Sequence, residues 1–235
     1  MATVLTNIPE LATAQRVPEL QAGDRLTRAE FERRYAAMSH VKKAELIEGI
    51  VYMPSPVSHQ EHGGPHFNLV LWLGSYVVQT PGLEGSDNAT VRLDLDNEPQ
   101  PDIFLRIRPE FGGQSRNSGK YIGGAPELVA EVAASSVSYD LHDKLHAYQR
   151  NGVREYLVWR VADQAIDWFV LREGRFERLA LDSAGHYPSE VFPGLRLDPA
   201  ALIRGDLARV MAVLQQGLAS PEHAEFVGRL EQQKT

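Results

Sequence analysis

Two carboxylates stand at positions that could hold a metal ion for phosphodiester hydrolysis. Asp102 opens the apolar segment 101–108, and Glu131 lies inside a second apolar segment, ELVAEV. A carboxylate in the middle of a buried strand is costly unless a cation neutralises it. Mg²⁺ or Mn²⁺ takes such oxygen ligands, polarises a phosphoryl oxygen and lowers the pKa of an attacking water. Asp102 and Glu131 are therefore candidate catalytic metal ligands, and the alternative for each is a solvated or salt-bridged strand acid.

A lysine belongs to the same candidate site. The helix expected over 139–150 has an apolar stripe formed by Leu141, Leu145 and Tyr148. Lys144 falls within this stripe and not on the solvent face. Because the helix follows Glu131 closely, its inner face can pack over that strand, and the Lys144 ammonium could stabilise the charge that develops during hydrolysis. The alternatives are that Lys144 extends outward or pairs with Asp140 one turn back.

A hairpin expected over 44–53 offers a third acid. We place its turn at Glu48-Gly49, since glycine can supply a positive φ. Glu45 and Glu48 would point to opposite faces of a strand, so at most one can enter the site. Glu45 is the preferred catalytic candidate and Glu48 the weaker one, because Glu48 fits the turn. An exposed hairpin acid is the alternative for both.

Three histidines crowd the segment SHQEHGGPH, at positions 59, 62 and 66. Their spacing raises the possibility of zinc. Gly63, Gly64 and Pro65 separate the last two histidines, which argues against a regular helical face of ligands. His62 is the candidate for a phosphate contact or proton carrier, with a helix-entry or surface role as the alternative.

The glycine-rich segment 112–124 is expected to be a loop. It does not match the phosphate-binding pattern G-x-x-x-x-G-K-[ST], because Tyr121 follows the lysine, and this excludes that class of nucleotide hydrolase. Arg116 and Lys120 remain candidates for contacts with a DNA backbone. No G-x-S-x-G motif is present, so a serine hydrolase is poorly supported.

The composition narrows the class of protein further. The 235 residues are within the range of one domain, and the absence of cysteine excludes disulfides, thiolate catalysis and cysteine-based metal sites. A net charge of -7 argues against a simple nucleic-acid coat, but not against a nuclease whose metal needs local acid. The first residues do not resemble a secretory signal, and no apolar run is long enough to span a membrane, so we expect a cytoplasmic protein.

The elements that must position these side chains can be placed from their periodicity. An irregular N-terminal segment over 1–24 precedes a core domain over 25–204, and C-terminal helices over 205–235 pack on or extend that domain. Pro54 and Pro56 end the hairpin. Further helices are expected over 27–38, 66–78, 207–218 and 222–230, and strands over 88–95, 101–108, 127–132, 156–161, 165–171 and 175–181. This order predicts an α/β (mixed α+β) fold with a central mixed sheet flanked by helices.

Several motifs in this order resemble those of the large bacterial restriction-endonuclease family, a branch of the PD-(D/E)XK nuclease superfamily. The resemblance runs from about Thr27 to about Leu202. It rests on four stretches of sequence: AELIEGIVYMPSP, Pro101-Asp102, ELVAEV and YDLHDKLHAYQRNGVREYLVW. The last is the most specific, because a lysine-bearing helix, an Asn-Gly-Val-Arg-Glu-Tyr turn and a tryptophan-containing strand come in fixed order. The resemblance implies a restriction-endonuclease-like core with Asp102 and Glu131 as metal ligands.

The sequence departs from the superfamily pattern at two places. Ala133 stands two positions after Glu131, where the superfamily has its lysine. The family resemblance implies that this lysine is displaced to the following helix as Lys144. Ala134-Ser135-Ser136 stands where the family often has Ser-Pro-Ser, which affects the expected loop geometry and not the acids.

The leading hypothesis is a metal-dependent endonuclease acting on DNA. The alternative is a catalytically inactive nuclease fold that serves as a DNA- or protein-binding module, since fold alone does not establish function. A third hypothesis is a metal hydrolase of another type that uses the histidines. By analogy with two-fold restriction nucleases, we expect a homodimer.

Overall fold

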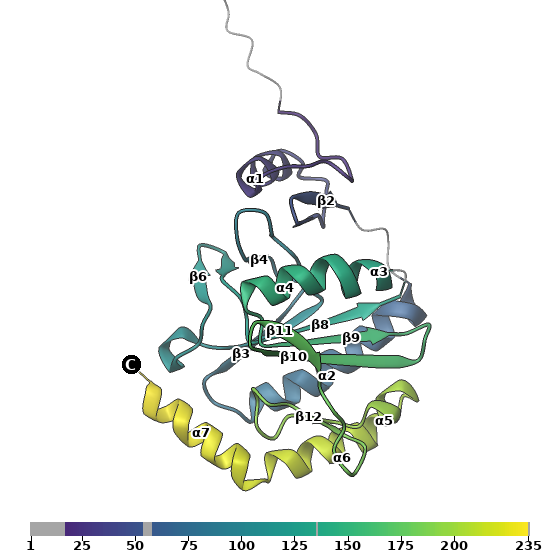
Figure 1. Ribbon diagram of the computed structural model, residues 1–235, viewed down its shortest axis with the longest axis vertical. Helices are drawn as coiled ribbons and strands as arrows, with labels where there is room; N and C mark the ends of the chain where they lie inside the picture. Colours follow the sequence, from purple (N-terminus) through teal and green to yellow (C-terminus); the bar gives the residue numbers. More distant parts are fainter. Residues whose placement is uncertain (1–16, 54–57, 135, 235) are drawn as a thin grey trace, which may run out of the picture.

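The fold is built on a six-stranded mixed β-sheet. The computed structural model describes residues 17–53, 58–134 and 136–234 (Figure 1). The strand order is β11-β10-β9-β8-β5-β3, in which β8 and β9 run parallel and the other neighbours are antiparallel. The strands are β3 (Leu83–Asp87), β5 (Ile103–Ile107), β8 (Leu128–Ala133), β9 (Glu155–Arg160), β10 (Ala165–Arg172) and β11 (Arg175–Arg178). Together with the helices on both of its faces, this sheet confirms the predicted mixed α/β class.

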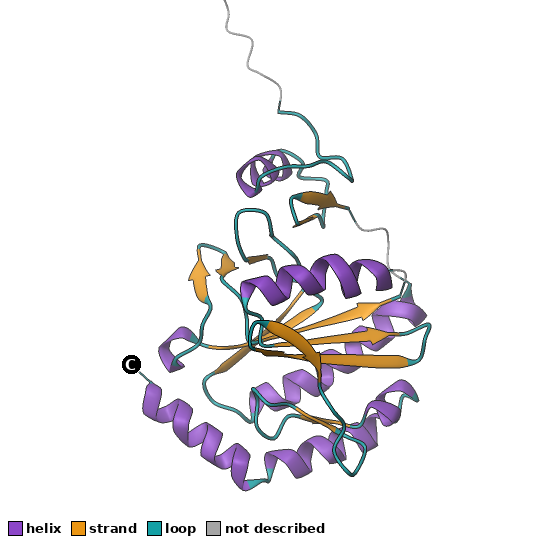
Figure 2. Cartoon of the chain, viewed as in Figure 1, coloured by secondary structure: helices purple, strands orange, loops and turns teal. Residues whose placement is uncertain are grey.

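Helices cover both faces of the sheet (Figures 1 and 2). One face carries a continuous helical segment made of α3 (Val137–Tyr139), the π-helical turn η3 (Asp140–Lys144) and α4 (Leu145–Asn151). The other face packs against α2 (Gly64–Val78). A strand covered on both faces usually has a nearly continuous apolar sequence, so an acid such as Glu131 within ELVAEV is an exception to the pattern.

Alternation along β8 decides which side chains meet which helix. Leu128, Ala130 and Val132 belong to the apolar cluster shared with α2. Val129 and Ala133 belong to the opposite cluster, which includes Tyr148 of α4. Because successive side chains of a strand point to opposite faces, Glu131 faces the helical segment that carries Lys144. The expected helix over 139–150 is confirmed, although its first part is π-helical and it begins at Val137.

A smaller unit lies beside the α4 face of the sheet. It comprises α1 (Arg28–Ala36) and the hairpin of β1 (Glu45–Ile47) and β2 (Ile50–Tyr52), which share an apolar cluster. The hairpin turns at Glu48 and Gly49, with φ values of 51° and 73°, as a two-residue turn of this kind requires. The hairpin prediction is therefore confirmed. Pro54 and Pro56 lie outside the described residues, as do residues 1–16 of the predicted irregular segment.

Two predictions for the middle of the chain are wrong in extent, and one strand was not predicted. The expected strand over 88–95 is reduced to β4 (Val91–Arg92), and the edge strand is instead β3, whose sequence LEGSD lacks the usual β-forming side chains. The expected loop over 112–124 contains a hairpin of β6 (Arg116–Ser118) and β7 (Tyr121–Gly123), next to the 3₁₀ turn η2 (Pro109–Phe111). Its turn is possible because Gly119 adopts a φ of 62°.

The histidine segment is helical throughout, contrary to expectation. The π-helical turn η1 (His59–Gly63) continues directly into α2, which begins at Gly64. Pro65 stands in the first turn of α2, directly after the π-helical turn, and the helix continues through it. His62 and His66 therefore lie one turn apart, with stacked rings 5.7 Å between centroids.

The C-terminal part covers the α2 side of the core. It contains β12 (Tyr187–Pro188), β13 (Arg196–Leu197), α5 (Pro199–Ile203), α6 (Leu207–Leu218) and α7 (Pro221–Gln233). Val210, Leu214, Phe226 and Leu230 of α6 and α7 belong to the same apolar cluster as the sheet and α2. The two expected terminal helices are confirmed, and α5, β12 and β13 were not foreseen. Within the part of the chain that the structure describes, no helix is long and apolar enough to cross a membrane.

Candidate active site

The predicted acids and lysine line one cavity of about 940 Å³. The cavity lies where the β1–β2 hairpin, the start of α2 and the η3 turn meet the β5 and β8 strands. The ionisable side chains that line it include Lys43, Glu45, His62, Asp102, Glu131, Asp140 and Lys144. Four of these are carboxylates, each no more than 4% exposed. The site therefore concentrates buried negative charge at one place.

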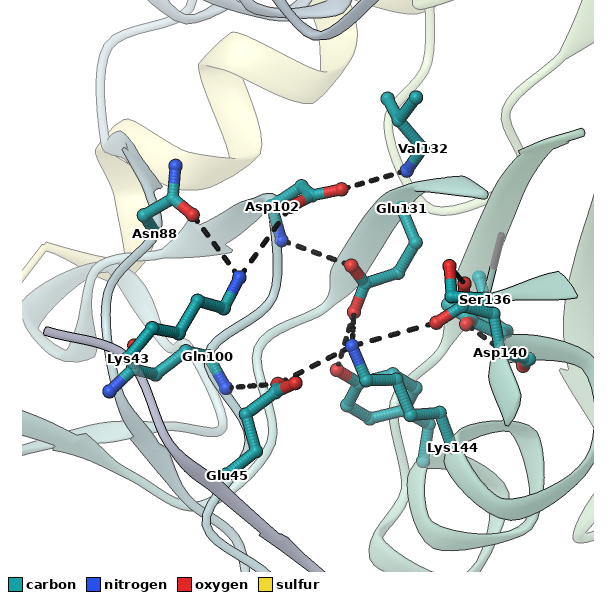
Figure 3. Close-up of polar contacts among 12 residues, drawn as sticks. Lys43, Glu45, Asn88, Gln100, Asp102, Glu131, Val132, Ser136, Asp140 and Lys144 are labelled. Carbon is teal, nitrogen blue, oxygen red and sulfur yellow. Dashed lines mark hydrogen bonds and ion pairs between the residues drawn. The ribbon is translucent and has the colours of Figure 1, made fainter. Parts of the chain in front are cut away.

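The ammonium of Lys144 lies in the middle of three of these carboxylates (Figure 3). Its Nζ is 2.9 Å from Glu131 Oε1 and 3.3 Å from Glu45 Oε1. A third contact, of 3.6 Å, joins it to Asp140 Oδ1 one turn back in the same helix. Lys144 thus makes the intrahelical pair that was its alternative assignment, but its shortest contact crosses to the strand acid.

The register of β5 and β8 brings Asp102 and Glu131 together. Ile103 pairs with Ala130, so the residue before Ile103 lies opposite the residue after Ala130. Glu131 Oε2 accepts a hydrogen bond from the backbone N–H of Asp102 at 3.2 Å. In return, Asp102 Oδ2 accepts one from the backbone N–H of Val132 at 2.9 Å. Two acids that are far apart in sequence are therefore fixed next to each other by main-chain donors.

Two histidines and a second lysine surround Asp102. His62 Nε2 lies 3.1 Å from Asp102 Oδ2, and Lys43 Nζ lies 3.8 Å from Oδ1. His66 Nε2 contacts the Asp102 backbone carbonyl at 3.1 Å, so both histidines of the helical turn face this residue. Burial by itself would raise the pKa of Asp102, but the contact with His62 and the charges of Lys144 and Lys43 outweigh burial and lower it. Asp102 is therefore held as a carboxylate.

Glu131 has the opposite electrostatic balance. Burial raises its pKa to about 8 even though Lys144 acts to lower it, and the charges of Asp102, Asp140 and Glu45 raise it further. The pKa of Lys144 is raised in turn, because the three carboxylates around it outweigh its own burial. Tyr148 donates a further hydrogen bond to Glu131 Oε1 at 3.0 Å. The cluster thus holds more carboxylates than cations at its centre.

This donor set suits a hard divalent cation that keeps much of its water. Among residues 17–53, 58–134 and 136–234, no three histidine, aspartate or glutamate side chains are arranged to hold a metal ion by themselves. Mg²⁺ is commonly held by only one or two carboxylates, with water and substrate phosphate completing its shell. Asp102 and Glu131 provide two such carboxylates in a cluster with excess negative charge. The residues present therefore fit Mg²⁺ or Mn²⁺.

The remaining predicted residues divide between the site and its surroundings. Glu45 enters the site, where its Oε1 also accepts the backbone N–H of Gln100 at 2.7 Å. Glu48 stays in the hairpin turn and pairs with Arg150. Arg116 is exposed on β6 and does not line this cavity, and Lys120 lines a different one.

Sequence reasoning missed three residues that contact the predicted ones. Asp140 was considered only as a partner for Lys144, but it is a buried acid of the same cluster. Lys43 and Tyr148 were not identified as site residues. Lys43 could have been suspected, because it lies two positions before Glu45 and would share its face of a strand. Tyr148 could not have been identified in this way, because nothing in the neighbouring sequence distinguishes a tyrosine that donates to Glu131 from one that is simply buried in the apolar stripe.

Comparison with known proteins places the chain in a family. No curated protein matches it significantly. A solved structure described as "a putative nuclease belonging to DUF820 from Anabaena variabilis" is similar, at 14% identity and a TM-score of 0.49, over 73% of this chain and 97% of that one. The sequence model of the Uma2 family, described as "Putative restriction endonuclease", matches residues 28–200. Since this match covers well over half of the sequence, the chain belongs to the Uma2 family of restriction-endonuclease-like proteins.

Proposed function

We propose that this protein is a metal-dependent endonuclease that hydrolyses DNA phosphodiester bonds. The observation that carries the proposal is the convergence of Asp102, Glu131 and Lys144 in one cavity, with Lys144 Nζ 2.9 Å from Glu131. Membership of a restriction-endonuclease-like family supports a nuclease-like activity. Carboxylates for a metal and an ammonium for the developing charge are the two requirements of this hydrolysis.

Asp102 and Glu131 would hold the Mg²⁺ or Mn²⁺ ion. When bound, the ion would polarise a phosphoryl oxygen and lower the pKa of a water molecule. Asp102 suits this role because its pKa is lowered, so it is a carboxylate at neutral pH. The main-chain N–H groups of Asp102 and Val132 fix the two carboxylates in orientation, which reduces the reorganisation required when a substrate binds.

Lys144 and its neighbours act on the phosphate and on the attacking water. The Lys144 ammonium would stabilise negative charge on the phosphate or orient the water. Glu45 and Asp140, 3.3 and 3.6 Å from Nζ, position this ammonium. His62, 3.1 Å from Asp102, can hold a proton at Nε2 near the phosphate.

The cavity also carries groups suited to a polyanion. Lys42 and Lys43 line it together with His62 and His66, although the whole chain has a net charge of -7. Phosphate contacts of this kind contribute to affinity without reading sequence. DNA binding would therefore depend on this local basic rim and not on the overall charge.

Cleavage assays on supercoiled and linear DNA with Mg²⁺ or Mn²⁺ test the proposal. We expect wild-type cleavage to be abolished by EDTA, by Asp102→Ala and by Lys144→Ala. Glu48→Gln, which changes an acid outside the cavity, is the matched control and should cleave like wild type. If folded wild-type protein bound metal and DNA but did not cleave, the alternative of an inactive nuclease fold acting as a binding module would replace this proposal. Cleavage that survived in Lys144→Ala would refute the role given to that lysine.

The assembly and location of the protein remain predictions. A homodimer would present two sites to the two strands of duplex DNA, as two-fold nucleases do. Sedimentation velocity on the purified chain, with and without duplex DNA, tests the homodimer. A cytoplasmic location is the corresponding expectation for an enzyme acting on DNA, and fractionation of cells tests it.

A further inference from the structure

Helix α2 carries a stripe of exposed apolar side chains. Its buried side packs into the core through Leu69, Trp72, Leu73 and Tyr76. Its other side exposes the four members of the stripe, which are Phe67, Val70, Leu71 and Val78. Phe67 is 65% and Val78 is 85% exposed. These are four of the six large apolar side chains that are exposed among the described residues, so such exposure is concentrated on this one helix.

The sequence of α2 is uncharged as well as apolar. Residues 63–83 contain no aspartate, glutamate, lysine or arginine. A helix that is apolar on all sides is normally buried on all sides, whereas the described chain buries only one side of α2. The stripe exposes on the order of 400 Å² of apolar surface, and a contiguous patch of this size often marks an interaction site. We therefore expect another macromolecule to cover this side of the helix.

The order of side chains along the stripe is complementary to itself. If two copies of α2 pack antiparallel about a two-fold axis midway between positions 72 and 73, each residue before the axis faces the residue equally far beyond it. The exposed positions then meet in three pairs, each of a larger and a smaller side chain: Phe67 with Val78, Val70 with Ser75, and Leu71 with Gly74. A Cβ added at Gly74 would meet nothing within 4 Å, so there is open space for Leu71 of the second copy. The Ser75 hydroxyl donates to the Leu71 backbone carbonyl of its own helix at 2.7 Å, so it would bring no unpaired donor into the interface.

Charge favours a second copy of this chain as the occupant. The chain has a net charge of -7, so two copies repel each other over much of their surface. The uncharged stripe lets two copies meet without bringing like charges together. A lipid surface is bound best by helices that carry lysine or arginine beside their apolar face, and residues 63–83 have neither.

We propose that the α2 stripe joins two copies of this chain in an antiparallel, two-fold dimer. The inference rests on the homodimer expected for the proposed function and adds the surface that forms it. His66 Nε2, in the first turn of α2, contacts the Asp102 carbonyl at 3.1 Å, so the candidate active site lies at one end of the stripe. At about 1.5 Å per residue, the two copies of His66 would lie about 20 Å apart along the paired helices. This separation is shorter than one turn of duplex DNA, about 34 Å, so one dimer would present both sites to one duplex.

Sedimentation velocity over a range of protein concentrations, without metal or DNA, tests the inference. Wild type should be a dimer, and Leu71→Glu should raise its dissociation constant about 100-fold, because each dimer would bury two copies of the new charge. Leu95→Glu is the matched control, since Leu95 is 74% exposed outside α2, and it should dimerise like wild type. Gly74→Glu guards against loss of folding, because glycine is unfavourable inside a helix and the new side chain has open space in the single chain. It should be at least as stable as Leu71→Glu and equally monomeric.

The register of the two helices can be tested by cross-linking, because the chain has no cysteine of its own. Phe67→Cys and Val78→Cys are prepared separately and treated with a thiol cross-linker, each alone and after mixing and exchange. In the antiparallel register, position 67 of one copy lies beside position 78 of the other, whereas the two copies of position 67 are about 16 Å apart. A cross-linker shorter than this separation should therefore link the mixture and neither variant alone.

Three results would each overturn the inference. They are a wild type that is monomeric at every concentration tested, a folded Leu71→Glu that dimerises as tightly as wild type, and cross-linking of either cysteine variant alone as strongly as of the mixture. The DNA cleavage assay separates the two proposals. Cleavage by a monomeric wild type would remove only this inference, and absence of cleavage by a wild type that dimerises through α2 would remove only the proposed hydrolysis.

Discussion

Replacing Lys144 with methionine should destabilise the protein strongly, because it removes the cation at the centre of the site. The ammonium is 4% exposed and contacts Glu131, Glu45 and Asp140 at 2.9, 3.3 and 3.6 Å. Methionine retains most of the side-chain volume, so the change isolates the charge. Breaking a buried ion pair by removing one partner costs about 3–5 kcal/mol, since the remaining charge stays buried and uncompensated.

Urea unfolding at pH 8 without metal measures this loss. The comparison variant is Lys43→Met, whose Nζ is 3.8 Å from Asp102 and whose side chain is 27% exposed. A more exposed and longer pair of this kind contributes only about 0–1 kcal/mol. In the double variant Lys144→Met/Glu131→Gln, which also removes the acid at 2.9 Å, we expect part of the lost free energy of unfolding to return.

Two results would contradict the reasoning. A free energy of unfolding of Lys144→Met within about 1 kcal/mol of wild type would show that the ammonium does not neutralise the cluster. Equal losses in the single and double variants would show that Glu131 is not the principal partner of Lys144. Both outcomes are readable without any nuclease activity, so they test the electrostatics of the site by themselves.

Three other predictions concern metal binding, the pH dependence of stability, and the hydrogen bond from the Tyr148 hydroxyl to Glu131. Mg²⁺ at about 100 times its dissociation constant should raise the melting temperature of wild type by roughly 5–10 °C, and EDTA should reverse this rise. An equal rise in Asp102→Ala would refute the assignment of Asp102 as a metal ligand. Burial raises the pKa of Glu155 to about 7, so the folded chain keeps a proton that the unfolded chain loses above about pH 4.5. Stability should therefore fall by about 3 kcal/mol between pH 4.5 and 7, and Glu155→Gln should flatten this slope in urea unfolding at pH 5 and 8; an unchanged slope would contradict the assignment. Tyr148→Phe should cost about 1–3 kcal/mol by removing the 3.0 Å hydrogen bond to Glu131, and cleavage should fall less than in Lys144→Ala; a variant as stable as wild type would show that this bond contributes little.

The placements that sequence could predict depend on local periodicity. Lys144 lies in an apolar helical stripe, and Glu131 shares a face of a buried strand with Val129 and Ala133. Each fact can be read within a window of a few residues, because helix and strand periods fix which face a side chain occupies. The Glu48-Gly49 turn is a signal of the same local kind.

The relations that sequence could not predict depend on pairing between distant segments. The register that places Asp102 beside Glu131 is set by the antiparallel pairing of β5 with β8, and no residue type in either strand predicts this register. The edge strand β3 was missed because its side chains are polar or small and only its main chain pairs with β5. The helical path through Gly63 and Pro65 was missed because these residues usually end helices. Here Gly63 is the last residue of η1 and Pro65 lies in the first turn of α2.

Lys144 lies on a helix and not on β8 because the side chains packed against β8 leave no room for a lysine at position 133. Ala133, where the superfamily pattern would place a lysine, is fully buried in the apolar cluster that contains Tyr148 and Val158. A lysine stem at that position would have to displace these side chains or bury its ammonium among them, which is costly in a packed core. An alanine leaves room for the helical segment to approach the strand, and that approach brings Lys144 to Glu131 from above the sheet. The same ammonium also contacts Glu45 on the β1–β2 hairpin, so one lysine joins acids from two separate sheets. The site therefore forms only when the hairpin, β8 and the helical segment are packed together.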